Sequence, residues 1–209
     1  MSTALLASEA ATVEIDGSVL LPPVTFEAAA GEWWCLLGPN GSGKTTLLRA
    51  LLGTRALSSG ACVLEGETID LARPRHRRRI AALVEPIPLA RDLTVVEQVT
   101  MVAASWFGDS VDGVSRAHEV IDELGIGRLV DRFPHQLSAG QLQLFNLALV
   151  LVRPSEVLLL DEPERHLDAD RVQMLGDVLR SRSAAGSLVV SATHDPALTS
   201  KADHELILG

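Results

Sequence analysis

The segment GPNGSGKT, residues 38–45, constrains the fold of this chain more than any other feature. It follows the apolar run Trp33–Leu37 and leads into Thr45–Leu52, which has helical spacing and is ended by Gly53. In such a unit of strand, glycine loop and helix, backbone N–H groups surround phosphates and the helix N-terminus adds partial positive charge. The sequence therefore predicts a phosphate-binding loop at the end of a buried strand.

The side chains of this loop indicate a nucleoside triphosphate and a magnesium ion as its ligands. Lys44 is expected to reach the β- and γ-phosphates and to assist catalysis, and Thr45 is expected to ligate Mg²⁺. The residues expected to contact ATP are Gly38, Pro39, Asn40, Gly41, Ser42, Gly43, Lys44, Thr45 and Thr46. A chance match in a chain of this length is on the order of one percent, and the flanking strand and helix lower that figure further.

Two adjacent carboxylates follow a second buried run. Val157–Leu160 has the composition of a buried strand, and Asp161 and Glu162 stand at its carboxyl end, where an open α/β sheet places its ligands. Asp161 is expected to hold Mg²⁺, directly or through water. Glu162 is then free to orient and deprotonate the attacking water. The alternative is that the two acidic residues merely cap a strand. The presence of the phosphate loop in the same chain argues against it.

A histidine follows a third buried run. His194 comes two residues after Leu188–Ala192, so it is expected at the same ligand-facing edge of the sheet as Asp161 and Glu162. There it could contact the γ-phosphate as part of the catalytic set. A lone histidine at a strand end is otherwise usually a polar surface residue.

The remaining pattern predicts one α/β domain over residues 1–209. Further strands are expected at Thr12–Ile15, Val24–Glu27 and Ala61–Glu65, and further helices at Val95–Phe107, Val114–Leu124, Gln141–Val152 and Ala169–Arg182. The first three of these helices predict a helical insert over roughly residues 88–150. The fourth supplies a crossover between parallel strands.

Composition excludes several classes of protein. Although 47% of the residues are hydrophobic, the longest apolar stretch, Leu144–Val152, is far shorter than a membrane span and contains Asn146. The first residues lack the basic start of a secretory signal, so the chain is expected to stay inside the cell. A net charge of -9 argues against a nucleic-acid partner. Cys35 and Cys62 are expected to be reduced core thiols.

One run of basic residues, Arg73–Arg79, interrupts this pattern. We interpret it as a solvated connection between strands. The alternative is a contact with a partner protein or with anionic lipid headgroups.

Leu137–Gln141, with the sequence LSAGQ, resembles the signature LSGGQ of ATP-binding cassette (ABC) ATPases in four of five positions. The phosphate loop, the helical insert, the signature, the Asp161–Glu162 pair, Leu167–Asp168 and His194 also occur in the order of that family. The resemblance covers nearly the whole chain. It implies a P-loop NTPase core of α/β class with a mostly parallel sheet, an N-terminal antiparallel β subdomain and an inserted helical subdomain.

The same resemblance implies a dimer. Family members pair head to tail, and each ATP lies between the phosphate loop of one subunit and the signature of the other. Ser138, Gly140 and Gln141 would then contact the ATP of the partner, and Asp168, in the family's D-loop, would couple the two sites. An ordinary serine-capped helix start and a plain helix N-cap are the alternatives for Ser138 and Asp168.

Four departures from the family pattern qualify the resemblance. Glu85 stands where the family usually has a glutamine, and its carboxylate could approach Mg²⁺. Ile15 stands nearest the place of the aromatic residue that often stacks on adenine. No basic residue occurs in Leu142–Asn146, and Arg165–His166 replaces small residues. The last two lie near the expected dimer interface, so pairing with a different subunit stays open beside a homodimer.

The function implied is that of a bacterial ATPase subunit, located in the cytoplasm and peripheral on the inner face of the membrane, that drives a separate membrane permease. Gly31–Trp34, together with the signature, looks somewhat like exporter subunits, including the haem-export type. One alternative is a cassette ATPase that acts on DNA or ribosomes. Another is an ATP-binding partner that hydrolyses weakly within a heterodimer.

Overall fold

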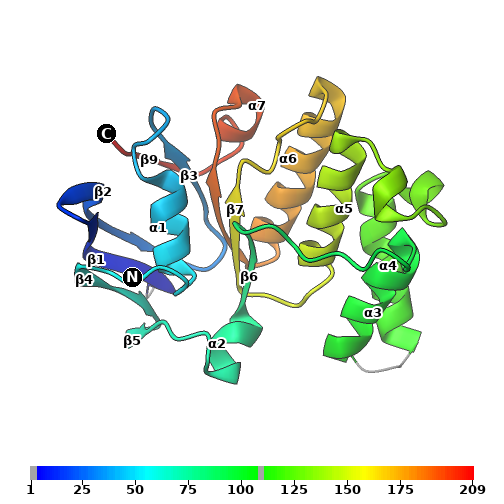
Figure 1. Ribbon diagram of the computed structural model, residues 1–209, viewed down its shortest axis with the longest axis horizontal. Helices are drawn as coiled ribbons and strands as arrows, with labels where there is room; N and C mark the ends of the chain where they lie inside the picture. The colour runs from blue at the N-terminus through cyan, green and yellow to red at the C-terminus, as the bar shows by residue number, and fades with distance from the viewer. Residues whose placement is uncertain (1–3, 108–110) are drawn as a thin grey trace.

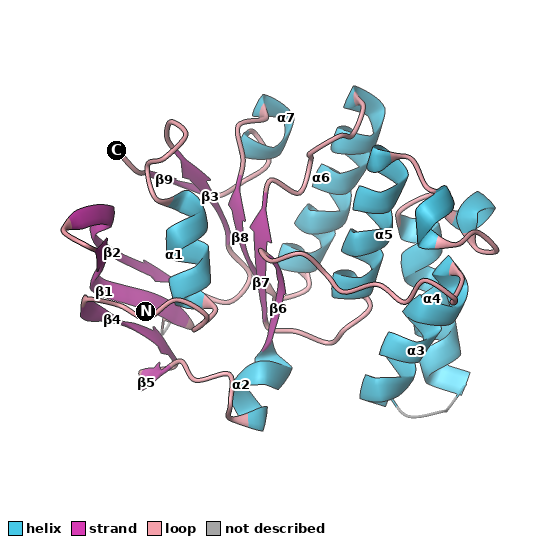
Figure 2. Cartoon of the chain, viewed as in Figure 1, coloured by secondary structure: helices cyan, strands magenta, loops and turns pink. Residues whose placement is uncertain are grey.

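A five-stranded parallel sheet forms the centre of the fold, seen in a computed structural model that describes residues 4–107 and 111–209. Its strand order is β6-β7-β8-β3-β9, and every neighbouring pair is parallel (Figures 1 and 2). The strands are Trp33–Leu37 (β3), Ile80–Leu83 (β6), Val157–Asp161 (β7), Leu188–Ala192 (β8) and His204–Ile207 (β9). All five residues of β8 are buried, because layers of structure cover both faces of the sheet.

A four-stranded antiparallel sheet, with the order β2-β1-β4-β5, lies on one side of this core. Its strands are Leu6–Ile15 (β1), Ser18–Ala28 (β2), Ser59–Leu64 (β4) and Glu67–Thr68 (β5). The antiparallel β subdomain expected from the family resemblance is therefore confirmed. Strand β1 begins earlier than predicted, because irregular pairing at Ala10 breaks the alternation on which the prediction depended.

Strand β2 also begins earlier than predicted. The predicted strand started at Val24, after Pro22 and Pro23, but both prolines lie inside the observed strand. Proline lacks an N–H donor and usually argues against a strand, but it is tolerated on an edge strand, and β2 is an edge. Asp16 and Gly17 connect β1 to β2 with φ angles of 50° and 76°. Two such residues form the tight turn that fits the twist of a hairpin.

Seven α-helices and two short 3-10 turns complete the described part of the chain. The helices are Lys44–Leu51 (α1), Pro74–Arg79 (α2), Val95–Phe107 (α3), Val111–Glu123 (α4), Ala139–Leu151 (α5), Ala169–Ala184 (α6) and Pro196–Thr199 (α7), and the turns are Gly127–Leu129 and Pro134–Gln136. Helix α1 lies between the two sheets, whereas α5 and α6 lie on the other side of the parallel sheet and α3 and α4 lie beyond them (Figure 1). No helix among the described residues is long and apolar enough to cross a membrane.

Two hydrophobic cores follow from this layering. One joins the parallel sheet to α1 and the antiparallel sheet, and it includes Leu36 and Leu47. The other joins the sheet to α3–α6, and Trp33 and Phe145 are its largest fully buried side chains. The indole N–H of Trp33 donates to Ser191 Oγ at 2.9 Å, which satisfies the one polar atom that this side chain buries.

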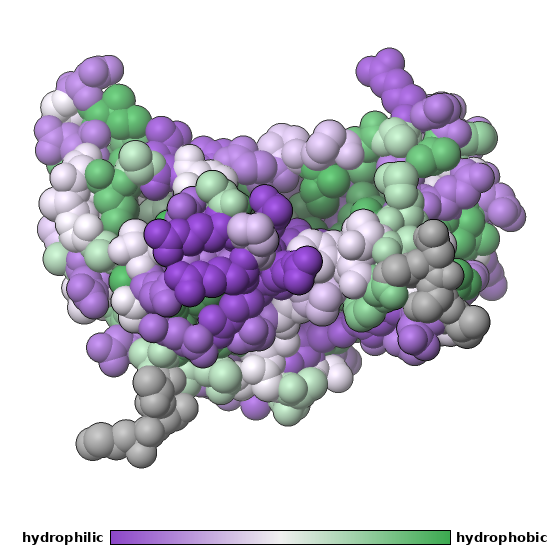
Figure 3. All heavy atoms as spheres, turned by 90° about the horizontal axis from the view of Figure 1, so that it is seen from below, coloured by the Kyte–Doolittle hydropathy of each residue, from purple (hydrophilic) through white to green (hydrophobic). Residues whose placement is uncertain are grey.

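The basic run Arg73–Arg79 does connect two strands, but it forms helix α2, which the sequence pattern did not predict. Its arginines pair with acidic neighbours: Arg79 lies 2.7 Å from Glu65 and 2.6 Å from Glu156, and Arg75 pairs with Glu67. Figure 3 shows hydrophilic residues gathered on this side of the molecule. Because these carboxylates offset the positive charge, the solvated connection remains the better interpretation of the run.

The core around α5 gives a direct test of the packing. Replacing Phe145 by alanine should lower the free energy of unfolding by about 3 to 5 kcal/mol, because its fully buried ring would leave a cavity. Met101→Ala, at a side chain that is 53% exposed, is the matched control and should change stability by less than about 0.5 kcal/mol. Urea denaturation followed by circular dichroism measures both. Equal losses would contradict the assignment of Phe145 to the core.

Candidate ATP-hydrolysis site

The phosphate loop runs from the end of β3 to the start of α1, and its glycines are required by close contacts. Gly38 and Gly43 have φ angles of 141° and 98°. A Cβ atom on Gly38 would lie 2.1 Å from the carbonyl oxygen of Leu208, and one on Gly43 would lie 2.8 Å from that of Leu20. The loop is therefore packed between β2 and the residue that follows β9, and only glycine lets its backbone lie so close to both.

Lys44 opens α1, and its side chain folds back over the loop. Its ammonium donates to the carbonyl oxygens of Gly38 at 2.6 Å and Pro39 at 3.0 Å, and the residue is 8% exposed. No acidic residue stands in the first turn of α1, so the positive end of the helix dipole adds to this charge. The arrangement provides a cation at a helix N-terminus, which favours an anionic ligand.

Thr45 and Asp161, the two residues expected to ligate Mg²⁺, contact each other directly. The hydroxyl of Thr45 donates to Asp161 Oδ2 at 2.7 Å, and this joins α1 to the end of β7. Burial raises the pKa of Asp161, against the lowering effect of the Thr45 hydrogen bond. Hydroxyl and carboxylate oxygens are hard ligands, and Mg²⁺ usually takes one or two protein ligands together with phosphates and waters. This donor pair therefore fits Mg²⁺.

Glu162 lines a small polar cavity beside this pair. Its φ of 45° is unusual for a residue with a side chain, and its N–H donates to the Ala192 carbonyl at 2.9 Å. Strain of this kind persists where the surroundings hold it, often at functional sites. The cavity has a volume of about 240 Å³, and among its lining residues are Glu85, Gln143, Asn146, Asp161, Glu162 and Arg165.

Glu85 lines the same cavity, so the structure brings this departure from the family pattern close to Asp161 and Glu162. Its carboxylate pairs with Arg49 Nε of α1 at 2.7 Å. This pairing offsets the extra negative charge that a glutamate brings to the site. A role for Glu85 as a ligand of Mg²⁺ stays a prediction.

His194 lies beyond β8, at the edge of the sheet that carries the carboxylates. Ala192 is the register partner of Asp161, which places the segment that follows each of them side by side. The side chain of His194 is exposed, and its backbone N–H donates to Glu164 Oε1 at 3.3 Å.

Sequence reasoning missed two residues that hold this edge together. Gln143 of α5 donates to the carbonyl oxygens of Glu162 and Pro163 at 3.3 and 3.0 Å, and Glu164 accepts from the segment after β8. No periodic pattern marks either position. Glu164 could have been noticed only as a charge beside the predicted carboxylate pair.

The signature residues start helix α5. Ser138 accepts the N–H of Gln141 at 3.3 Å, and Gln141 Oε1 accepts the N–H of Ser138 at 3.0 Å, which together make a capping box. Asp168 likewise caps α6 by accepting the N–H of Arg171 at 3.0 Å. Ser138 and Asp168 therefore do cap their helices within one chain, as the alternative interpretation of each residue expected.

The structure does not bring the signature to the phosphate loop of the same chain. Figure 1 shows the start of α5 and the start of α1 apart, with β7, β8 and α6 between them. Gly140 instead packs against the segment before α6, where a Cβ atom would lie 2.6 Å from the carbonyl oxygen of His166.

The place expected for adenine carries aliphatic side chains. Ile15, Val19 and Leu20 at the β1–β2 hairpin are 40%, 60% and 38% exposed, and Gly43 of the phosphate loop packs against Leu20. An apolar surface therefore stands next to the loop, although it lacks an aromatic ring.

Comparisons with known proteins agree with this architecture. The sequence model described as "ABC transporter" matches residues 21–165. The putative hemin import ATP-binding protein HrtA of Staphylococcus epidermidis is 31% identical over 192 residues, with 88% of this chain and 85% of that protein covered. The Fe(3+) ions import ATP-binding protein FbpC 2 of Haemophilus influenzae is 35% identical over 182 residues, covering 84% of this chain and 51% of that protein.

Solved structures agree as well. An ATP-binding subunit of an ABC transporter superposes with a TM-score of 0.82 at 25% identity, covering 98% of this chain and 85% of the other. The protein cbiO1 from Clostridium perfringens, part of the ABC transporter complex cbiONQ, gives a TM-score of 0.82 at 27% identity, covering 99% and 85%.

The chain belongs to the ABC transporter family. Within it, this protein is an ATP-binding subunit, and it hydrolyses ATP. HrtA and FbpC 2 are named as import proteins for hemin and Fe(3+) ions, and a third relative, SugC of Mycobacterium tuberculosis, is named as a trehalose import protein. The expectation of an exporter therefore has no support among them.

The contact between Gly140 and His166 is open to test. Gly140→Ala should lower the free energy of unfolding by about 1 to 3 kcal/mol, because the new methyl group meets a backbone oxygen that cannot give way easily. Ala139→Gly, at the exposed neighbouring position, is the control and should cost about 1 kcal/mol or less. Chemical denaturation measures both without nucleotide. A Gly140→Ala protein as stable as the wild type would refute the contact.

Proposed function

We propose that this chain hydrolyses MgATP at the junction of the phosphate loop and β7, and that it drives a separate membrane permease from the cytoplasmic face of the membrane. The observation that carries the proposal is the hydrogen bond between Thr45 and Asp161, beside the cavity of Glu162. It joins the loop suited to phosphates with the strand end that bears the carboxylates.

Each group at this junction has a distinct task in the proposal. Lys44 exchanges its carbonyl partners for the β- and γ-phosphate oxygens, since a charge-assisted hydrogen bond to phosphate is the stronger one. Thr45 and Asp161 hold Mg²⁺, which offsets negative charge on the phosphates. Glu162 accepts a proton from a water beside the γ-phosphate. His194 contacts the γ-phosphate from the neighbouring strand end.

The signature completes the site from a second subunit. Ser138, Gly140 and Gln141 stand at the N-terminus of α5, where backbone N–H groups and the helix dipole favour an anion. Because the start of α5 lies apart from the phosphate loop in one chain, these residues reach a γ-phosphate only across a head-to-tail dimer. Asp168, which caps α6, lies in the segment that would cross between the two sites.

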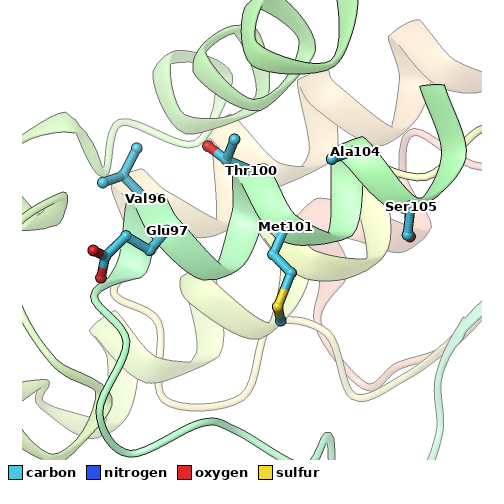
Figure 4. A pocket seen from close by; sticks show the side chains of 6 residues that line it. All are labelled: Val96, Glu97, Thr100, Met101, Ala104 and Ser105. Atoms are coloured by element: carbon cyan, nitrogen blue, oxygen red, sulfur yellow. The ribbon is translucent and has the colours of Figure 1, made fainter. Parts of the chain in front are cut away.

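The permease would dock on helix α3 of the helical region. An open groove of about 640 Å³ runs along this helix and is lined by Val96, Glu97, Thr100, Met101, Ala104 and Ser105. Figure 4 shows these side chains along the helix, with Met101 projecting outward. Methionine suits a surface that adapts to an apolar partner, and Met101 is 53% exposed.

Two substitutions separate binding from hydrolysis. Lys44→Ala should weaken ATP binding at least about tenfold, because it removes the phosphate-binding cation. Glu162→Gln should leave binding within about twofold and lower kcat about 100-fold or more, because an amide cannot accept the proton. Phosphate release and equilibrium binding of a fluorescent ATP analogue measure the two effects. Equal turnover by wild type and Glu162→Gln would favour a weakly hydrolysing partner of a heterodimer.

The docking surface is tested by charge insertion. Met101→Glu should abolish co-purification of the permease from detergent-solubilised membranes, because it places a carboxylate in an apolar contact, and it should leave basal ATP hydrolysis within about twofold. Val114→Glu on α4, 47% exposed and outside the groove, is the control and should keep the permease. Recovery of the wild type with ribosomes or DNA and without a membrane protein would instead favour the non-transport alternative.

A further inference from the structure

Glu164 links the segments that follow two neighbouring strands. It stands two residues after Glu162, and its Oε1 accepts the hydroxyl of Thr193 at 2.6 Å and the N–H of His194 at 3.3 Å. One carboxylate oxygen on the β7 side thus fixes both a side chain and a backbone group on the β8 side.

The position of Glu164 carries a cost in free energy, because part of its carboxylate is buried. Burial raises the pKa of Glu164, although the hydrogen bonds from Thr193 and His194 act to lower it. Its Oε2 is buried and receives no hydrogen bond from the residues that the structure describes. Buried carboxylates of this kind are uncommon in a region held by apolar packing alone.

The hydrogen bonds continue beyond Thr193. This residue is fully buried, and its hydroxyl, which donates to Glu164, also accepts the N–H of Asp195 at 3.0 Å. Asp195 in turn caps helix α7 by accepting the N–H of Ala197 at 2.8 Å. The segment on both sides of His194 is therefore held by a connected chain of hydrogen bonds that begins at Glu164.

A second hydrogen bond connects the β7 side to the β8 side two residues before Glu164, at Glu162. The N–H of Glu162 donates to the carbonyl of Ala192 at 2.9 Å, and the left-handed backbone at Glu162 depends on its surroundings. With hydrogen bonds at both Glu162 and Glu164, the segment after β7 is joined to the end of β8 and to the segment that follows it.

We propose that Glu164 is a positioning residue that sets the place of His194 relative to Glu162. The proposal rests on the proposed function, in which Glu162 and His194 act on the same γ-phosphate. Glu164 itself contacts neither nucleotide nor metal in this scheme. Small displacements of reacting groups cost large factors in rate, so a residue that fixes this spacing affects turnover more than ATP binding.

Paired variants test the proposal. Glu164→Leu removes the acceptor and Thr193→Val removes the hydroxyl donor at nearly constant shape. Glu164→Gln and Thr193→Ser retain the acceptor oxygen and the hydroxyl, so they serve as conservative counterparts. Glu156→Gln, at an exposed carboxylate that bonds Arg79, is the control for loss of a surface charge.

Two measurements are made on each protein. The first is kcat and KM for ATP hydrolysis. The second, which needs no activity, is the rate of hydrogen exchange at the His194 amide, followed by NMR on the folded protein without nucleotide.

Glu164→Leu and Thr193→Val should each lower kcat about tenfold or more and change KM by less than about twofold. Exchange at the His194 amide should rise about tenfold in Glu164→Leu, as expected for loss of the hydrogen bond that this amide donates. Glu164→Gln, Thr193→Ser and Glu156→Gln should keep at least about half of the wild-type kcat. This combination of results supports the proposal.

Values of kcat within about twofold of wild type in both disruptive variants would overturn the proposal, as would a tenfold loss of kcat with unchanged exchange at His194. If Glu164→Leu fails to fold, Thr193→Val decides the kinetic question alone. A wild-type protein that hydrolyses no ATP would instead refute the proposed function, while the exchange rates would still report on the hydrogen bond.

Discussion

The hydrogen bond between Thr45 and Asp161 is the contact on which the rest of the site depends. It spans 2.7 Å between a helix that starts at the phosphate loop and a strand that ends in the carboxylate pair. Residues 116 positions apart in the sequence are thereby fixed against each other. The closely packed glycines Gly38 and Gly43 lie at one end of this junction and Glu162, with its positive φ, lies at the other, so the groups proposed to bind phosphate and to activate water are adjacent.

The sequence predicted the parts of the fold that local chemistry determines. Buried parallel strands are apolar throughout, so β3 and β8 were predicted with their observed bounds, and helix α3 was predicted from its spacing. The position of the phosphate loop between a strand and a helix, and that of Asp161 at a strand end, were predictable because the residue types at these places are typical of such positions. Strand β6 was missed because Ile80–Leu83 is only four residues long and follows a basic run.

What the sequence could not predict were interactions between distant segments. Whether Glu85 would face solvent, metal or a cation depends on where Arg49 lies, and the folded chain places the two 2.7 Å apart. The same holds for Glu164, whose partners lie 29 and 30 residues away in the segment after β8. Helix α2 was missed because its arginines are stabilised by carboxylates from β5, the loop before it and the residue before β7.

The packing of Gly140 against the His166 carbonyl has a consequence for how such sequences are read. The glycine stabilises a single chain in the absence of nucleotide, because a Cβ atom there would lie 2.6 Å from a backbone oxygen. A copy of this protein that had lost its enzymatic activity would therefore still lose stability if Gly140 were replaced. Retention of this glycine alone would therefore not show that such a copy is active.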